Sequence, residues 1–254
     1  NGIVDLDNLE TMLSKSPALV CIMFANNETG VIQPIEKISE IVRKYNSYLF
    51  CDAVQAYGKI KINFDQLNIH FMALSAHKVG GFPGSGALII NENIKKIIPK
   101  ISGGGQEFGM RGGTENLIGI TAFGECAKLI DKIYSENIKL KEYINILEKN
   151  IESFGGFIFG VNTERLPNTS FFAFPDINAD TLLMKLDLAG YSVSSGSACS
   201  SGKVKKSHVL EAMNIDDKIL SNAIRVSLGW ATKKNHITSF INFFENSFNK
   251  SVLE

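Results

Sequence analysis

The sequence predicts an α/β protein, and three observations support this class. Short, nearly continuous apolar runs occupy 18–24, 48–53, 69–75 and 86–91, the pattern of strands that are covered on both faces. A helical pattern separates the first two runs, with Ile35, Ile38 and Val42 on one face and Pro34 near its start. Polar residues follow the ends of the runs. We therefore expect strand–helix–strand units and a mainly parallel sheet.

The second half of the chain predicts a smaller α+β domain. A long amphipathic segment runs from about Gly119 to Phe154, with apolar residues at helical spacing. A strand is expected over 169–175, a helix over 179–190, a strand over 223–229 and a final amphipathic helix that ends in Phe243 and Phe244. We expect a large domain over 1–125 and a small domain over 126–254 that contains the linking helix.

Composition and charge exclude several classes of partner. The chain has 254 residues and is 44% hydrophobic, which is enough for an ordered globular protein. Its 26 basic residues balance its 26 acidic ones, so no net charge attracts nucleic acid or an anionic membrane. Neither a membrane-spanning run nor a signal peptide is visible, and we expect a cytoplasmic protein. The start at Asn1 suggests that the first part of a longer protein is missing.

The four cysteines do not form the spacings of a disulfide or zinc framework. Cys21, Cys51 and Cys126 lie in apolar or helical patterns, so we expect them to be buried. Cys199 lies in "VSSGSACSSGK", where serines and glycines surround it and no apolar neighbour would bury it. It is a candidate nucleophile, although an incidental surface cysteine would have the same surroundings.

The stretch "ALSAHKVGGFPGSGAL" at 73–88 contains Ser75, His77 and Lys78 between an apolar run and glycines. Ser75 and Lys78 match the Ser-x-x-Lys pattern of serine acyl-transfer enzymes, but the pair follows a strand, and Ser-Asp-Asn and Lys-Thr-Gly are absent. No Gly-Lys-Ser/Thr ends the glycine stretch, which argues against a phosphate loop. The simplest alternative is a surface lysine beside a turn.

Polar residues after two other strands favour a functional lysine. Asp52 and Gln55 come at the carboxyl end of one strand, and Asn27 follows another. Ligands of open α/β sheets gather at such strand ends. A pyridoxal phosphate site needs a lysine that binds the cofactor covalently and an acidic partner for its pyridine nitrogen. The combination around Lys78 therefore indicates a pyridoxal phosphate site.

Six segments of the chain carry a family resemblance. They are "MFANNETGVIQPI", "CDAVQAYGKI", "SAHK", "GGGQEFGMRGGTEN", "SSGSACSSG" and "IRVSLG". In this order and spacing they resemble the cysteine desulfurase family of fold-type I pyridoxal phosphate enzymes, along essentially the whole chain. The resemblance implies that L-cysteine is converted to L-alanine. It also implies that the sulfur stays on the enzyme as a persulfide, for iron-sulfur cluster or other thiocofactor assembly.

The resemblance assigns roles around the cofactor. Lys78 would bind pyridoxal phosphate and move protons at the substrate Cα, with His77 beside it in the catalytic group. Asp52 would keep the ring nitrogen protonated, and Gln55 would donate a hydrogen bond to the ring hydroxyl. Ser75 and His77 would bind the phosphate.

Further roles concern the substrate, the sulfur and a second subunit. Asn27 would contact the cofactor and the substrate, and Arg225 would clamp the substrate carboxylate. Thr114 would reach the phosphate of a neighbouring subunit, which implies a homodimer. Cys199 would attack the substrate sulfur and then pass it to an iron-sulfur scaffold or another acceptor protein. No metal site is expected beyond a transient iron-sulfur contact at Cys199.

Three departures from the family pattern are visible. Gly81 is followed by Phe82, Pro83 and Gly84 where relatives usually have Gly-Pro-Lys-Gly, which indicates an altered turn. The loop after Cys199 resembles the long-loop class that usually serves iron-sulfur assembly, but "KVKKSHVL" makes it basic, and we expect this charge to tune the acceptor interface. The family's amino-terminal part is absent, including a histidine that stacks on the cofactor, so we expect weak cofactor binding and slow or no turnover by the 254-residue chain.

Two alternatives remain open at this level. The cofactor residues alone do not set the substrate, so a selenocysteine lyase or a related fold-type I enzyme has the same pattern. Cys199 distinguishes a cysteine desulfurase from a selenocysteine lyase, because persulfide formation requires it. A catalytically silent scaffold that keeps the fold is the second alternative.

Overall fold

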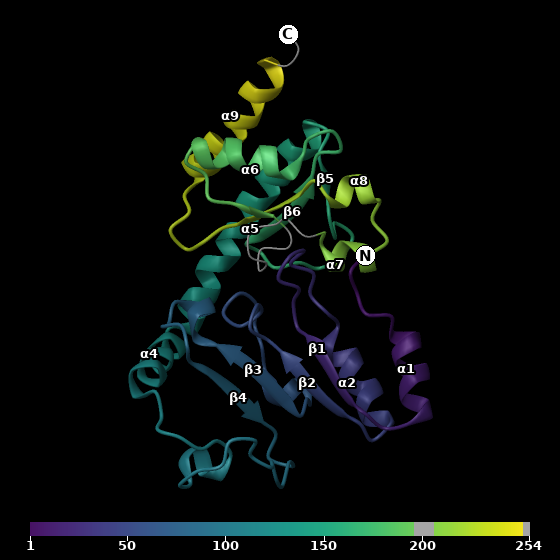
Figure 1. Ribbon diagram of the computed structural model, residues 1–254, viewed down its shortest axis with the longest axis vertical. Coiled ribbons are helices and arrows are strands. Elements are labelled where there is room, and N and C mark those ends of the chain that lie inside the picture. Colours follow the sequence, from purple (N-terminus) through teal and green to yellow (C-terminus); the bar gives the residue numbers. More distant parts are fainter. Residues whose placement is uncertain (196–205, 251–254) are drawn as a thin grey trace. The chain divides into compact units, whose positions relative to one another are not determined.

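The computed structural model describes residues 1–195 and 206–250, and of 248–250 the backbone alone (Figure 1). Its contacts divide the chain into two compact units. Unit 1 contains Asn1–Ile3, Ala25–Ile32 and Ser135–Glu254, and unit 2 contains Val4–Phe24 and Gln33–Tyr134. The short segment Ala25–Ile32 therefore belongs with the carboxyl-terminal part. The predicted domain boundary after residue 125 lies inside helix α4 (Leu117–Lys128). Unit 2 extends further along the chain, to Tyr134.

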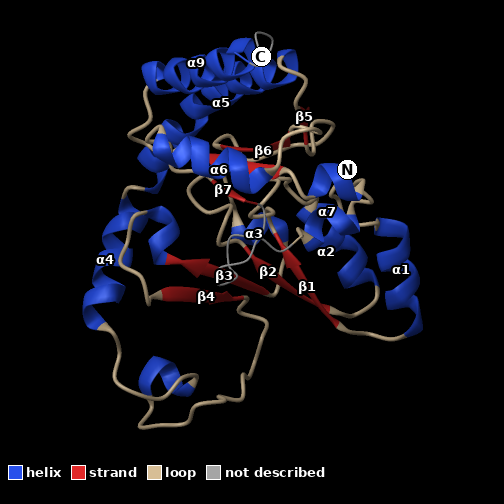
Figure 2. Ribbon diagram, turned by 45° about the horizontal axis from the view of Figure 1, so that its top comes forward, coloured by secondary structure: helices blue, strands red, loops and turns tan. Residues whose placement is uncertain are grey.

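Unit 2 is built on a four-stranded sheet of order β1-β2-β3-β4, drawn in red in Figure 2. The strands are β1 (Leu19–Met23), β2 (Tyr48–Asp52), β3 (Phe71–Ser75) and β4 (Gly86–Ile90). The first three are parallel and β4 is antiparallel to β3. This confirms the mainly parallel sheet, and each strand lies within one of the four predicted apolar runs.

Helices connect the strands of unit 2. In chain order they are α1 (Leu6–Lys15), α2 (Ile35–Lys44), the short α3 (Phe64–Leu67), the 3-10 helices η1 (Ala76–Val79) and η2 (Gln106–Gly109), and α4. Asp5 caps α1 by accepting a hydrogen bond from the Asn8 N–H. Helix α2 packs against β2 and buries Ile38 and Val42, as its apolar periodicity predicts.

One face of this sheet is not covered by the described residues of its unit. The exposed fractions are 58% for Leu19, 40% for Met23, 51% for Tyr48 and 49% for Leu88. Cys21 lies between Leu19 and Met23 on the same face and is also exposed. The prediction of strands covered on both faces, with Cys21 buried, is therefore wrong. Apolar runs indicate a strand, but they do not show which layer of the fold covers its second face.

The predicted long helix over 119–154 is interrupted once. Helix α4 ends at Leu129, where the backbone has φ −96° and ψ 8°, and α5 (Ile130–Ser153) follows. The Leu129 N–H bonds to the carbonyls of Ala127 and Cys126, so the last turn of α4 is tightened rather than continued. Helix α5 begins in unit 2 and ends in unit 1.

Unit 1 contains an antiparallel sheet of order β5-β6-β8-β7. Its strands are β5 (Phe157–Ile158), β6 (Thr169–Ala173), β7 (Ser194–Ser195) and β8 (Ala223–Ser227). Its further helices are α6 (Ala179–Leu188), α7 (His208–Ala212), α8 (Asp217–Leu220) and α9 (Lys234–Lys250). Leu147 and Ile151 of α5 pack with Phe172, Ile224 and Phe244 in its core. The α+β prediction for this region is confirmed.

Candidate active site

The predicted cofactor residues lie at the ends of neighbouring strands in unit 2. Asp52 is the last residue of β2 and is paired with Ala73 of β3, and Ser75 ends β3 two residues later. Because alternate residues of a strand face the same side, Asp52 and Ser75 lie on one face of the sheet. His77 and Lys78 follow at once in η1. The parallel pairing thus brings an acid, a hydroxyl, an imidazole and an amine to one sheet edge.

Local hydrogen bonds orient four of the predicted cofactor residues. The Ser75 Oγ lies 2.8 Å from the His77 Nδ1. The Asp52 carboxylate accepts the Val54 N–H at 3.0 Å, and the Gln55 Oε1 accepts the Lys59 ammonium at 2.9 Å. Asp52, His77 and Lys78 are exposed, so a ligand can reach them.

The glycine after Lys78 fixes the end of η1. Gly80 has φ 92°, a left-handed conformation that glycine adopts without strain, and its N–H bonds to the Ala76 carbonyl. A close backbone approach occurs where β4 begins, because a Cβ on Gly86 would lie 2.6 Å from the Leu74 carbonyl oxygen. The glycines around Lys78 therefore shape the turn and the strand pairing that hold it.

Cys51, next to Asp52, is excluded as a nucleophile. It is fully buried, and this burial, with the nearby charge of Asp52, raises the pKa of its thiol to about 12. A thiol with such a pKa is protonated at neutral pH.

Thr114 lies exposed in the loop between η2 and α4. Helix α4, which follows this loop, packs against η1. Its role toward a neighbouring subunit stays a prediction, because that role needs a second copy of the chain.

The predicted substrate residues Asn27 and Arg225 meet within unit 1. Arg225 lies on β8, and its Nη1 donates to the Asn27 carbonyl at 2.9 Å. Its Nη2 donates to the Ser194 Oγ at 2.8 Å. A guanidinium has five N–H donors, so donors remain for a carboxylate. The side chain of Asn26 holds this turn by accepting the N–H groups of Glu28 and Thr29, both at 2.9 Å.

A buried carboxylate beside Asn27 was not anticipated from the sequence. Glu28 is 3% exposed, and its Oε2 accepts the Ser207 hydroxyl at 2.5 Å. Burial raises the pKa of Glu28, and the Ser207 hydrogen bond and the charges of His208 and Arg225 act in the opposite direction. The only sequence signal was its place in "NNETG", because its partner is 179 residues away. Cys199, by contrast, lies outside the described residues.

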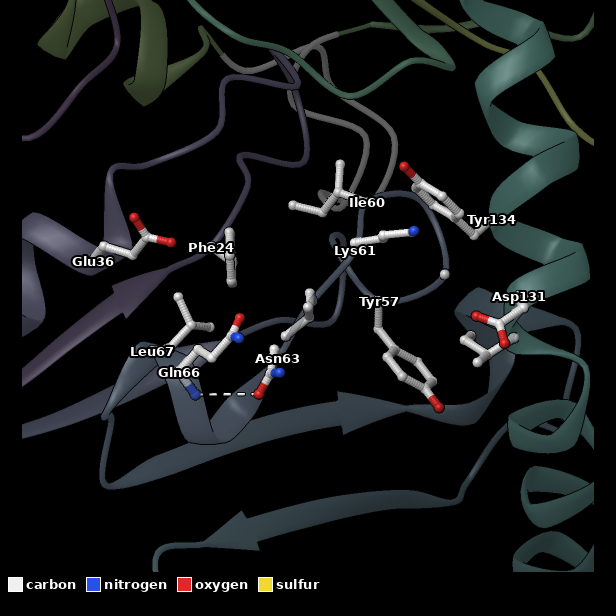
Figure 3. A pocket seen from close by; sticks show the side chains of 13 residues that line it. Phe24, Glu36, Tyr57, Ile60, Lys61, Asn63, Gln66, Leu67, Asp131 and Tyr134 are labelled. Carbon is white, nitrogen blue, oxygen red and sulfur yellow. Dashed lines mark hydrogen bonds between the residues drawn. The ribbon is translucent and has the colours of Figure 1, made fainter.

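Unit 2 also contains a pocket of about 490 Å³ (Figure 3). The loop after β2, helix α3 and the start of α5 line it. Lys61 points toward the ring of Tyr134, with its Nζ 5.5 Å from the ring centroid. None of the predicted site residues lines this pocket, so it is distinct from the group around Lys78.

Fold and site together define an α/β protein with a lysine and an aspartate at adjacent strand ends, joined to an α+β unit that carries an arginine. Comparison with protein-family models identifies the family to which this fold and site belong. The aminotransferase class-V model matches residues 1–240, and the chain belongs to this family.

Named relatives agree with this assignment. The chain is 39% identical to "Cysteine desulfurase IscS" of Dictyoglomus turgidum over 98% of its length, and 36% identical to "Cysteine desulfurase IscS" of Ehrlichia chaffeensis over 93%. A NifS-like protein from Rickettsia africae has a similar structure, with a TM-score of 0.88 and 39% identity over 98% of this chain and 67% of its own. The chain spans 64% and 58% of the lengths of the two desulfurases.

Among residues 1–195 and 206–250, no group of three or more His, Cys, Asp and Glu side chains is placed to hold a metal ion. Within the same part of the chain, no helix is both long and apolar enough to cross a membrane.

Proposed function

We propose that the protein is a pyridoxal phosphate-dependent cysteine desulfurase. The observation that carries the proposal is the placement of Lys78 and Asp52 at the ends of adjacent strands, with the Ser75–His77 pair beside them. The relatives named cysteine desulfurase support the choice of reaction within the class-V family. The proposal covers L-cysteine as substrate, an iron-sulfur scaffold or another acceptor protein as partner, and action in the cytoplasm as a homodimer.

The residues of unit 2 fit the proposed cofactor chemically. Lys78 offers an exposed amine and Asp52 an exposed carboxylate, which suit an aldehyde carbon and a protonated pyridine nitrogen. Ser75 and His77 offer short donors at a strand end, which suit a phosphate group. Pyridoxal phosphate supplies an electron sink for the carbanion at the substrate Cα when it is bound.

This chain's own residues then have defined tasks. Lys78 removes the proton from the substrate Cα and returns a proton to the product. Asp52 would keep the ring nitrogen of bound pyridoxal phosphate protonated, and Gln55 would donate to its ring hydroxyl through its amide. Arg225 and Asn27 bind and orient the substrate, with the carboxylate on the guanidinium.

The sulfur step assigned to Cys199 balances without an added oxidant. The Cys199 thiolate attacks the sulfur of the bound cysteine, an S–S bond forms and the substrate C–S bond breaks. The electron pair of that bond returns to the carbon, which takes up a proton and leaves as alanine. Cys199 keeps the sulfur as a persulfide until an acceptor thiol removes it.

The proposal is tested by measuring alanine and sulfide from L-cysteine, in the presence of pyridoxal phosphate and dithiothreitol. We expect equal amounts of both products from the parent protein. Lys78→Ala should abolish both, and Cys199→Ser should abolish persulfide formation. Alanine production that survives Lys78→Ala, or sulfide production that survives Cys199→Ser, would refute the assignment.

A further inference from the structure

The buried Glu28–Ser207 pair lies beside the proposed substrate residues Asn27 and Arg225, but it takes part in none of the proposed chemical steps. Both side chains are 3% exposed. The Ser207 Oγ donates to Glu28 and accepts the Leu210 N–H at 3.1 Å, so it also caps helix α7. A buried carboxylate needs such a donor, because burying it without one is costly. This single hydroxyl therefore joins the 26–29 turn to α7.

The same turn is tied to β8 through its neighbouring residue. The Asn27 carbonyl accepts Arg225, and Arg225 also holds Ser194. The charge of Arg225 acts directly on Glu28 and lowers its pKa, against the effect of burial. Five polar residues from one turn, one strand pair and one helix end thus form a continuous set of contacts inside unit 1.

The described residues on either side of 196–205 both belong to this set. Ser194 precedes that segment and bonds to Arg225, and Ser207 follows it and bonds to Glu28. Cys199 lies within the segment. Ser194 is thus held by the residue proposed to bind the substrate carboxylate, and Ser207 by the residue next to Asn27.

We propose that Glu28 and Ser207 are positioning residues for substrate binding. Their hydrogen bond fixes the 26–29 turn, so that the Asn27 carbonyl holds the Arg225 guanidinium in the orientation that receives a substrate carboxylate. This inference rests on the proposed function for the identity of the substrate. The positioning of Arg225 by Glu28 does not depend on turnover.

The experiment compares four variants with the parent protein. Glu28→Gln keeps an acceptor for Ser207, whereas Glu28→Ala removes it and Ser207→Ala removes the donor. The control is Glu148→Gln, which weakens another buried carboxylate contact of unit 1, to Arg165 at 2.6 and 2.7 Å. The readouts are the side-chain Nε–H resonance of Arg225 by NMR, the melting temperature, and KM and kcat for L-cysteine.

We expect Glu28→Ala and Ser207→Ala to shift the Arg225 resonance. They should raise the KM for L-cysteine about tenfold and change kcat by less than about twofold. This pattern is expected when a mutation weakens binding of the substrate and of the transition state by the same amount. Glu28→Gln should have a KM within about twofold of the parent value, because its amide oxygen still accepts the Ser207 hydroxyl. Glu148→Gln should lower the melting temperature and leave both the resonance and KM unchanged.

An unchanged Arg225 resonance in Glu28→Ala would overturn the inference, whatever the activity. So would a KM that rises equally in Glu148→Gln, because that pattern indicates general destabilisation. A parent protein that makes no alanine would count against the proposed function, while the Arg225 resonance would still decide whether Glu28 positions it.

Discussion

At the scale of single residues, burial sets the chemistry of Glu28 and Cys51. Both are covered groups whose pKa is raised mainly by loss of water, and both adjoin a residue of the proposed site. Because its pKa is raised, Cys51 next to Asp52 remains an unreactive thiol. Glu28 next to Asn27 keeps a hydrogen bond and remains under the influence of His208 and Arg225.

Glu28 should make the stability of unit 1 dependent on pH. A carboxyl group with a raised pKa binds its proton more tightly in the folded than in the unfolded state, so its contribution is most favourable at low pH. This contribution is lost as pH rises from the ordinary value of 4.5 through the raised pKa. Denaturation of the parent and of Glu28→Gln across this range should therefore show the parent losing stability relative to the variant. A constant difference would contradict the raised pKa.

The cysteines should react in an order that exposure sets. Cys21 is exposed and Cys51 is buried with a pKa of about 12. Iodoacetamide at about pH 8, followed by peptide mapping, should modify Cys21 in the native protein and leave Cys51 unmodified until denaturant is added. Equal modification of both cysteines in the native state would show that the sheet of unit 2 is not formed as described.

At this scale, a residue can be predicted from the sequence when its position depends on a local pattern. Asp52 and Lys78 were predicted together because a strand end can be read from an apolar run. The Glu28–Ser207 bond could not be predicted in this way. It joins parts of the chain that only the folding of unit 1 brings together, and neither residue is unusual in its own segment.

At the scale of elements, α5 holds the core of unit 1 through one face. Ile151 is fully buried and Ile146 is 38% exposed, although both lie on the same helix. Ile151→Ala should lower the free energy of unfolding by about 2–5 kcal/mol, because it leaves a cavity. Ile146→Ala is the matched control and should cost less than about 1 kcal/mol. Urea denaturation followed by circular dichroism measures both, and similar losses would contradict the packing.

Element positions were predicted well where periodicity extends over many residues. The strands of unit 2 and helix α6 agree closely with their predicted ranges, and α2 buries the apolar face that its spacing predicts. The break at Leu129 was missed because it contains neither glycine nor proline and arises from a tightened turn. The antiparallel direction of β4 was also not visible, since an apolar run has no direction.

At the scale of the whole molecule, the described part of the chain leaves one apolar face of the unit 2 sheet exposed. Leu19 on this face is 58% exposed, whereas Leu49 on the neighbouring strand is fully buried. Leu19→Lys should leave the fold intact and reduce binding of a hydrophobic dye, because it breaks up the exposed patch. Leu49→Lys should unfold the unit, because it buries a charge without a partner. Circular dichroism and dye fluorescence distinguish these outcomes, and unfolding by Leu19→Lys would contradict the exposed face.

The central claim is that Lys78 is the residue that binds the cofactor. The most direct measurement is borohydride reduction of the protein with pyridoxal phosphate, followed by mass mapping of the modified peptide. We expect one pyridoxyl group on Lys78, lost in Lys78→Ala and unaffected by Lys61→Ala. An adduct on Lys61 or spread over surface lysines, with Lys78 unmodified, would contradict the proposed role of Lys78.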